Sequence, residues 1–328
     1  MKAALLKRFF RAIRSGSESE LDSLCRSVVE DEKERGHDRV AADLESILLT
    51  NKKDSGPVKR GAFTKLPTNG KSLEPLFSEI DREQLRHHMV LPQAVEERFK
   101  RIEKEFAARQ RLASFGLEPR KRVLLHGPPG CGKSLGAERL AWNTGLPLLK
   151  VRFDTLLSSY FGETLTNLRK VFDAATERPC ALFLDECDTL ARSRLNRNDI
   201  GEASRITNTL LEMLEDFSGK GLIIAASNLD SELDSALLRR FDEVLRIPLP
   251  AAEQIEGILR TTLSSIETDK RLPWKAIAHE MDGMSCSEVA QIGQNAAKHT
   301  ILEGRKKVTA QDVRFALDEI HERHHREP

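Results

Sequence analysis

The chain has 328 residues, enough for about two domains with a sizeable core, and 31% of its residues are charged. Because the net charge is only +1, the composition does not favour a surface that binds nucleic acid or anionic membranes. No apolar run approaches the roughly eighteen residues of a membrane span, and five scattered cysteines without C-x-x-C spacing fit a reducing compartment, so we expect a soluble, cytoplasmic protein.

Residues 1–50 contain three amphipathic segments whose apolar residues recur at helical spacing. Turn-forming residues separate these segments, near Ser15 and again at Gly36. The first fourteen residues are basic and free of acids, as in a mitochondrial transit peptide. We favour the first helix of a small N-terminal helical bundle instead, because the following segments continue the same pattern.

Residues 51–75 mix Gly, Pro, Ser, Asn and Lys without periodicity, which is typical of a flexible linker. Residues 76–250 then form the predicted core of the protein. The core begins with a highly charged helical stretch from Leu85 to Gly116 and continues as alternating strand and helix patterns. Such alternation predicts an α/β domain with a parallel sheet covered by helices on both faces. The strands are expected at four short apolar runs: Arg122–His126, Leu148–Arg152, Ala181–Leu184 and Leu222–Ala226.

Beyond Pro250 the strand patterns stop, and residues 251–328 are predicted to form an all-helical C-terminal subdomain. Thr309, with Asp312 three residues later, is similar to a capping box at the start of the last helix. The expected helices are Gln254–Ser264, Trp274–Glu280, Ser287–Leu302 and Thr309–His321.

A glycine-rich turn, GPPGCGKS, separates the first strand of the core from a run of good helix formers. It matches G-x-x-x-x-G-K-[ST] in the strand–loop–helix context that a phosphate-binding P-loop needs. Glycines allow backbone N–H groups to face a phosphate, and the helix N-terminus adds further donors. Lys133 is expected to bridge the β- and γ-phosphates of ATP, and the Ser134 hydroxyl to ligate Mg²⁺. The predicted cofactor-binding residues of this loop are Gly127, Pro128, Pro129, Gly130, Cys131, Gly132, Lys133, Ser134 and Leu135.

A second strand pattern, ALFLDECD, ends in two acids. Side chains at the end of a strand of an α/β sheet face the crevice in which ligands bind. We expect Asp185 to hold Mg²⁺ through water and to belong to the cofactor site. Glu186 is the predicted catalytic base, which takes a proton from the attacking water or orients it.

From about Leu85 to the C-terminus the chain resembles the AAA family of ATPases, whose loop is usually GPPGTGKT; Cys131 and Ser134 are the departures here. The stretch AASNLD matches the family's polar sensor, which implies that Asn228 helps to place the attacking water. ALLRRFDEVLRIPLP resembles the arginine-finger segment, as found in members that disassemble ESCRT filaments or sever microtubules. The resemblance implies that Arg239 and Arg240 act on the nucleotide of a neighbouring subunit.

Two further segments carry the resemblance. DGMSCSEVAQIG is similar to the family's lid helix, although Cys286 and the three residues after it replace the usual G-A-D-L. SSYFGETL matches the family's pore loop at Tyr160, Phe161 and Gly162, which implies six aromatic loops that grip an extended polypeptide. The segment around Arg194 and Arg197 corresponds to the second pore loop.

Taken with the family, these motifs imply an ATP-hydrolysing protein remodeller or unfoldase that works as a homohexameric ring and threads a protein substrate. Family N-terminal domains, here residues 1–50, recruit substrate or an adaptor. No peptidase motif such as H-E-x-x-H or G-x-S-x-G occurs, so a partner protease would act in trans.

Two alternatives remain open at this point. A helicase-loader-like nucleic-acid ATPase would need a basic face, and the near-neutral charge and the Tyr-Phe-Gly loop count against it. A nucleotide-dependent binding switch would hydrolyse ATP slowly and would not depend on Tyr160.

Overall fold

The computed structural model of the chain describes residues 67–69, 74–156, 161–187, 200–228 and 235–326. All of them lie in the second of the two units into which the chain divides, Leu66–Pro328. The predicted N-terminal bundle, most of the predicted linker, Tyr160, and the second-pore-loop residues Arg194 and Arg197 lie outside the described residues. Where the predicted linker is described, Thr68 forms an antiparallel bridge with Pro75.

A six-stranded sheet forms the centre of the part that precedes Pro250, in the order β1-β3-β4-β5-β2-β6. Parallel pairing joins β3, β4, β5, β2 and β6 to their neighbours, whereas β1 pairs with β3 in the antiparallel sense. The strands are β1 (Phe77–Ile80), β2 (Arg122–His126), β3 (Leu148–Val151), β4 (Ala181–Leu184), β5 (Leu222–Ser227) and β6 (Glu243–Arg246).

Four of these strands confirm the sequence prediction and pair in parallel as expected, but the whole sheet is mixed. The sheet is mixed because β1 runs antiparallel at one edge, and β6 extends it at the other. Both edge strands are four residues long; β1 has a single buried residue, and β6 alternates buried with more exposed positions. They therefore lack the continuous apolar pattern of a strand buried on both faces, which is the pattern that predicted the central four.

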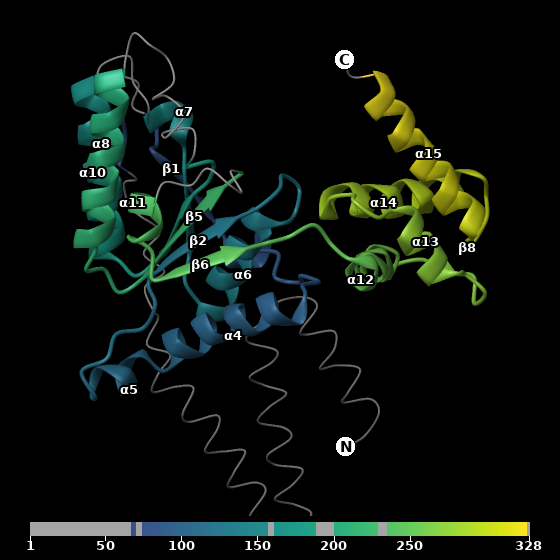
Figure 1. Cartoon of the computed structure of the whole chain (residues 1–328), viewed down its shortest axis with the longest axis horizontal. Helices are drawn as coiled ribbons and strands as arrows, with labels where there is room; N and C mark the ends of the chain where they lie inside the picture. The colour runs from purple at the N-terminus through teal and green to yellow at the C-terminus, as the bar shows by residue number, and fades with distance from the viewer. Residues whose placement is uncertain (1–66, 70–73, 157–160, 188–199, 229–234, 327–328) are drawn as a thin grey trace, which may run out of the picture. The chain divides into compact units, whose positions relative to one another are not determined.

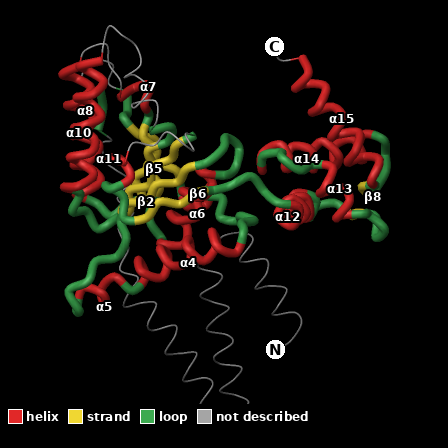
Figure 2. Tube along the Cα trace, in the orientation of Figure 1, coloured by secondary structure: helices red, strands yellow, loops and turns green. Residues whose placement is uncertain are grey.

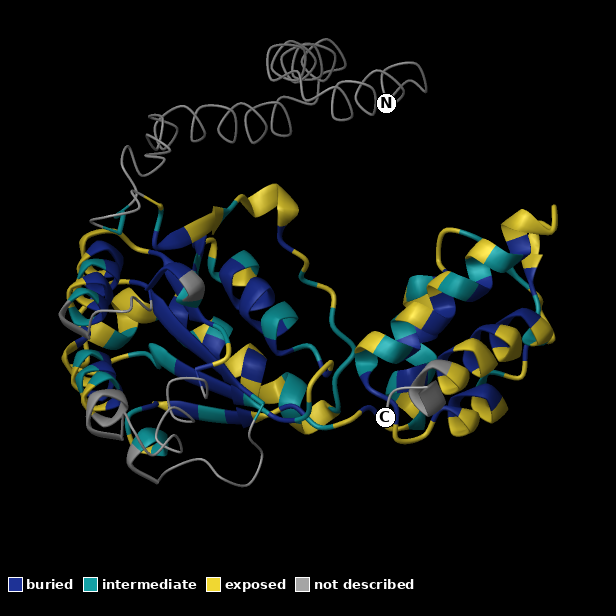
Figure 3. Ribbon diagram, turned by 90° about the horizontal axis from the view of Figure 1, so that it is seen from above, coloured by how far each residue is buried: buried dark blue, intermediate teal, exposed yellow. Residues whose placement is uncertain are grey.

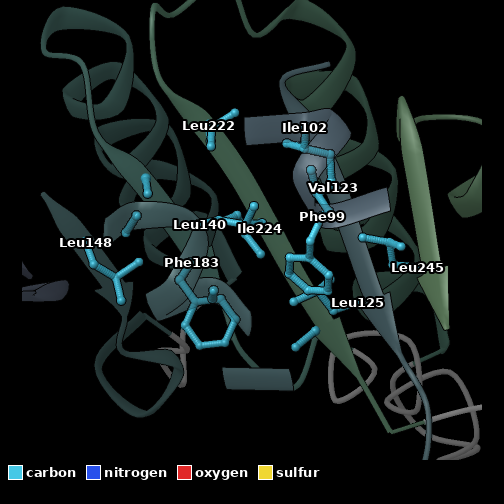
Figure 4. Close-up of a cluster of buried hydrophobic side chains, with 14 of the residues drawn as sticks. Phe99, Ile102, Val123, Leu125, Leu140, Leu148, Phe183, Leu222, Ile224 and Leu245 are labelled. Carbon is cyan, nitrogen blue, oxygen red and sulfur yellow. The ribbon is translucent and has the colours of Figure 1, made fainter. Parts of the chain in front are cut away.

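Helices cover both faces of the sheet (Figures 1 and 2). The face toward α4 and α6 holds a core that includes Phe99, Leu125, Leu140, Phe183 and Ile224 (Figure 4). On the other side, α8 and α10 pack against each other (Figure 1). The helices of this half are α4 (Gln93–Ala107), α5 (Arg109–Ala113), α6 (Lys133–Thr144), α7 (Phe153–Leu156), α8 (Phe161–Glu177), α10 (Ile200–Asp216) and α11 (Ser235–Leu238), with a 3-10 turn at Arg82–Gln84.

The C-terminal helices pack around a core of their own, with Leu259, Ile277, Ile292 and Ala316 buried in it. Their buried faces are the dark blue surfaces in Figure 3. The helices are α12 (Ala252–Thr262), α13 (Trp274–Glu280), α14 (Cys286–Leu302) and α15 (Ala310–Arg326).

The expectation that this C-terminal part is entirely helical was wrong in one detail. Two-residue strands, β7 (Glu267–Thr268) and β8 (Lys307–Val308), pair in parallel between its helices. Each is too short to show a period-two pattern in the sequence. The predicted cap of the last helix is present, because the Thr309 N–H and hydroxyl both donate to Asp312 Oδ2, over 2.9 and 2.7 Å.

Among the described residues, no helix is long and apolar enough to cross a membrane.

Candidate functional site

The ends of three neighbouring strands bring the predicted catalytic segments together. In the parallel register, His126 of β2 lies opposite Ser227 of β5, and Leu184 of β4 lies opposite Ala225. Gly127, Asp185 and Asn228 follow these strands directly. All three therefore lie at the carboxyl edge of the sheet, where α/β folds bind their ligands.

The loop between β2 and α6 has a backbone that requires its glycines. Gly127 has φ +139°, and a Cβ there would overlap the carbonyl oxygen of Ile247. Gly132, with φ +93°, leads directly into the first residue of α6. Residues with a side chain rarely adopt such φ values, so the loop's course depends on glycine. This loop, together with the N–H groups at the start of the helix, fits a bound phosphate.

Lys133 lies in the same loop and is 7% exposed. Its Nζ donates to the carbonyl oxygens of Gly127 and Pro128, over 2.8 Å each. The two carbonyl groups thereby hold the ammonium within the loop. A phosphate bound by the loop would lie close to this positive charge.

Ser134 and Asp185 meet, although 51 positions separate them in the sequence. The Ser134 hydroxyl donates to Asp185 Oδ2 over 3.2 Å. The same oxygen accepts a hydrogen bond from Nζ of Lys150 over 2.8 Å. Hydroxyl and carboxylate oxygens suit Mg²⁺, which usually takes few protein ligands and completes its shell with phosphate and water. The pair therefore fits a nucleotide-bound Mg²⁺, and within the described ranges no group of three His, Cys, Asp or Glu side chains offers another metal site.

Glu186 has an unusual backbone for its residue type. Its φ is +52°, and among the described residues it is the one non-glycine residue with a positive φ. Such a conformation costs on the order of 1–3 kcal/mol and tends to occur at functional sites. The Glu186 N–H donates to Asp185 Oδ1 over 3.1 Å, and the Cys187 N–H donates to Ala226 O of β5 over 2.9 Å. These bonds fix the turn after Asp185, in which the Glu186 side chain is exposed.

Asn228, the predicted sensor, is half-buried directly after Ser227, the buried last residue of β5. It therefore lies at the carboxyl end of β5, and its role as the sensor stays a prediction.

The two predicted arginines lie near the opposite ends of the strands from the P-loop. Strand β6 runs parallel to β2, with Val123 opposite Glu243 and His126 opposite Arg246. Arg239 and Arg240 precede β6, so they lie near the amino ends of the strands, whereas the P-loop follows their carboxyl ends. Arg239 is exposed.

Contacts within the chain hold this arginine segment. Arg240 forms an ion pair with Glu215 of α10. Asp242 accepts hydrogen bonds from the backbone N–H groups of Lys121 and Arg122, over 2.9 Å each, and from Nη2 of Arg122 over 2.6 Å. Burial alone would raise the pKa of Asp242, but these hydrogen bonds outweigh it and lower the pKa below its usual value. Sequence reasoning missed Glu215, Asp242 and Lys150, because each acts across a strand or helix pairing that the sequence does not display.

The start of α14 contacts the P-loop. The Ser287 N–H donates to Gly130 O over 2.9 Å. Burial, together with the nearby Cys131, raises the pKa of the Cys286 thiol to about 11. Ser285 caps the helix, because its N–H donates to Glu288 Oε2 over 2.6 Å while its hydroxyl accepts from the Glu288 N–H. The C-terminal helices thus meet the phosphate loop through Cys286 and Ser287, two residues at which the sequence departs from the family's lid pattern.

Only part of the predicted pore loop is described. Phe161 and Gly162 begin α8, and Tyr160 lies outside the described residues. The pore loop therefore stays a prediction.

The sequence is similar to those of known ATPases. A family model described as "ATPase family associated with various cellular activities (AAA)" matches residues 123–249. The "Uncharacterized AAA family ATPase y4kL" of Sinorhizobium fredii is 34% identical over 314 residues, which cover 93% of this chain and 91% of that protein. The "Proteasome-activating nucleotidase" of Methanosphaerula palustris is 35% identical over 212 residues, which cover 62% of this chain but only 52% of that protein.

Proposed function

The chain belongs to the AAA family of ATPases, and we propose that it uses ATP hydrolysis to remodel proteins as a ring-shaped oligomer. As an AAA ATPase it binds ATP, hydrolyses it to ADP and phosphate, and uses Mg²⁺ as the usual cofactor. The observation that carries the proposal is the division of the catalytic groups between opposite edges of one sheet, because it requires two subunits for one complete site.

The first group lies at the carboxyl edge. Lys133 and the N–H groups of the P-loop bind the phosphates, and Ser134 and Asp185 hold the metal. Mg²⁺, when bound, supplies positive charge to the phosphate oxygens. Glu186 accepts a proton from the attacking water, and Asn228 orients that water. The backbone turn at Glu186 keeps its carboxylate beside Asp185, since both Asp185 Oδ1 and Ala226 O hold the turn.

The second group is the arginine segment at the amino edge. A strand rises about 3.3 Å per residue, so five-residue β2 alone separates the arginines from the P-loop of their own chain by a distance that neither side chain spans. We therefore assign Arg239 and Arg240 to the γ-phosphate held by a neighbouring subunit, where an arginine is worth about 10³–10⁵ in rate. Glu215 and Asp242 position the segment.

The C-terminal helices act as the lid of the nucleotide site. Their contact with the phosphate loop, Ser287 N–H to Gly130 O, gives the lid a direct way to respond to a nucleotide. Residues 1–50 are assigned the recruitment of substrate or adaptor, as the family resemblance implies.

Tyr160, Phe161 and Gly162 are assigned to the pore of a hexamer, where they grip an extended polypeptide. One similar protein is named a proteasome-activating nucleotidase, which supports an activity on proteins and a partner protease that acts in trans. The near-neutral charge weighs against the alternative of a nucleic-acid ATPase. The experiment on Tyr160 described below distinguishes the protein remodeller from the alternative of a nucleotide-dependent binding switch.

The test uses Tyr160→Ala and Tyr160→Phe in the full chain, with unfolding of a tagged fluorescent protein as the readout. We expect Tyr160→Ala to keep nucleotide binding, assembly and basal ATPase within a few-fold while unfolding stops, because the apolar ring transmits the force. Tyr160→Phe should be mild, since the grip depends on the ring and not on the hydroxyl. Unchanged unfolding by Tyr160→Ala would favour the switch, and a failure of that variant to assemble would make Tyr160 a structural residue.

A further inference from the structure

We propose that Lys150 is an internal cation that competes with Mg²⁺ for Asp185 and so sets the Mg²⁺ concentration at which nucleotide binds. This inference rests on the proposed function, because it takes Ser134 and Asp185 as the metal-binding pair. It concerns a residue that no sequence motif singles out.

Strand pairing places Lys150 on the face of the sheet that carries the site. In the parallel register of β3 and β4, Lys150 lies opposite Phe183, and Asp185 is two residues further along the same chain. Because side chains alternate along a strand, residues two apart point to the same face. Nζ of Lys150 lies 5.6 Å from the centre of the Phe183 ring, which belongs to the core beneath α6 (Figure 4). The side chain therefore approaches Asp185 from the same side as Ser134, at the start of α6.

The two oxygens of Asp185 have different partners. Oδ1 accepts the N–H of Glu186, over 3.1 Å, and this bond belongs to the turn itself. Oδ2 accepts both the Ser134 hydroxyl, over 3.2 Å, and Lys150 Nζ, over 2.8 Å. Oδ2 is thus the oxygen that faces the predicted metal ligand, and it is also the oxygen that the ammonium contacts.

The positive charge of Lys150 makes it a competitor of Mg²⁺ for the Asp185 carboxylate. An ammonium at 2.8 Å neutralises the carboxylate that attracts a divalent cation, and two cations on one oxygen repel each other. The Lys150 side chain is 41% exposed and is carried on a flexible stem, so water can receive the ammonium when a metal displaces it. The cost of displacement is correspondingly modest. Lys150 therefore shifts the Mg²⁺ dependence of nucleotide binding without preventing it.

The test measures binding of a fluorescent, non-hydrolysable ATP analogue, mant-AMP-PNP, to the full chain over a range of free Mg²⁺ concentrations. Lys150→Met removes the charge and keeps the apolar stem over Phe183. We expect it to lower the Mg²⁺ concentration for half-maximal binding about two- to fivefold, the size of effect that one partly exposed ion pair supports. Lys150→Arg should keep the wild-type midpoint within about twofold.

Lys121→Met is the matched control. It also removes a lysine from an ion pair, with Glu118 over 3.1 Å, but at the amino end of β2 and not at the carboxyl edge of the sheet. Its Mg²⁺ midpoint should equal that of the wild type. If Lys150→Met proves unstable, Lys150→Gln provides the same loss of charge with a polar amide at the end of the side chain.

Asp185→Asn separates this inference from the proposed function. If Asp185→Asn leaves the Mg²⁺ midpoint unchanged, Asp185 does not hold the metal, and the assigned site is wrong. If Asp185→Asn raises the midpoint while Lys150→Met and Lys150→Gln leave it unchanged or raise it, the site stands and the competition is refuted. A raised midpoint would make Lys150 a residue that positions Asp185 for the metal.

Discussion

The Ser134 hydroxyl donates a hydrogen bond to Asp185 Oδ2 over 3.2 Å, which joins the first turn of α6 to the end of β4. Because this hydrogen bond joins the start of the helix to the acid that follows the strand, it connects the proposed phosphate site directly to the proposed metal site. This arrangement is built by parallel pairing of β4, β5 and β2, which brings the ends of three strands to one edge of the sheet.

Loss of the Ser134 hydroxyl should weaken nucleotide binding only when Mg²⁺ is present. We expect Ser134→Ala to raise the Kd for Mg²⁺-bound AMP-PNP about tenfold or more, since a hydrogen bond or ligand to a charged group is worth about 1.5–3 kcal/mol. In EDTA the Kd should match that of the wild type. Calorimetric titration measures both values, and an equal weakening in the two conditions would show that Ser134 shapes the loop and does not serve the metal.

Glu186→Gln should bind ATP and fail to hydrolyse it. The amide has the shape of the carboxylate and can keep the backbone at φ +52°, but it cannot accept the proton of the attacking water. We expect a turnover rate lower by about 10²–10⁴ with an unchanged Kd for ATP. The same variant serves as a trap for substrates in pull-down experiments. A near-normal ATPase rate would remove Glu186 from the base role.

Some of this site was predictable and some was not. The P-loop, the acidic strand end and the four central strands have local signatures: fixed glycine spacing and short apolar runs. The edge strands β1 and β6 were not predicted, because only some of their positions are buried and neither has a continuous apolar run. Lys150 and Glu215 were not predicted as site residues. Strand register and helix packing bring them to their partners, Asp185 and Arg240, and the sequence does not display either.

The stability of the C-terminal helices should depend on pH through Asp312. This carboxyl is 1% exposed; burial opposes its ionisation, but hydrogen bonds from Arg305, Thr309 and His299 prevail and hold its pKa well below the usual range. Since the folded pKa is depressed, the stabilisation is fully present above the unfolded value of about 3.9 and is lost as the pH falls below it.

Asp312→Asn should therefore lower the free energy of unfolding at pH 7 by about 1–3 kcal/mol, the cost of losing hydrogen bonds to a buried charged group. The difference from the wild type should shrink as the pH falls below about 4. Calorimetric unfolding of the full chain measures this, with Glu280→Gln as a control, because Glu280 pairs with Arg314 on the surface. A difference that stays constant with pH would show that the charge of Asp312 is unimportant.

The claim that one active site needs two subunits is tested most directly by mixing two inactive variants. Lys133→Ala should lose nucleotide binding but keep its arginine segment, and Arg240→Ala should bind nucleotide but lack the arginine that its neighbour needs. Each alone should hydrolyse ATP at least about 10³-fold more slowly than the wild type. Mixed rings contain interfaces at which the P-loop of one variant meets the arginines of the other. The account predicts an ATPase rate in the mixture that is well above the sum of the two separate rates and that rises more than linearly with protein concentration. A mixture no more active than that sum, at concentrations where mixed assembly is verified, would contradict catalysis across the interface.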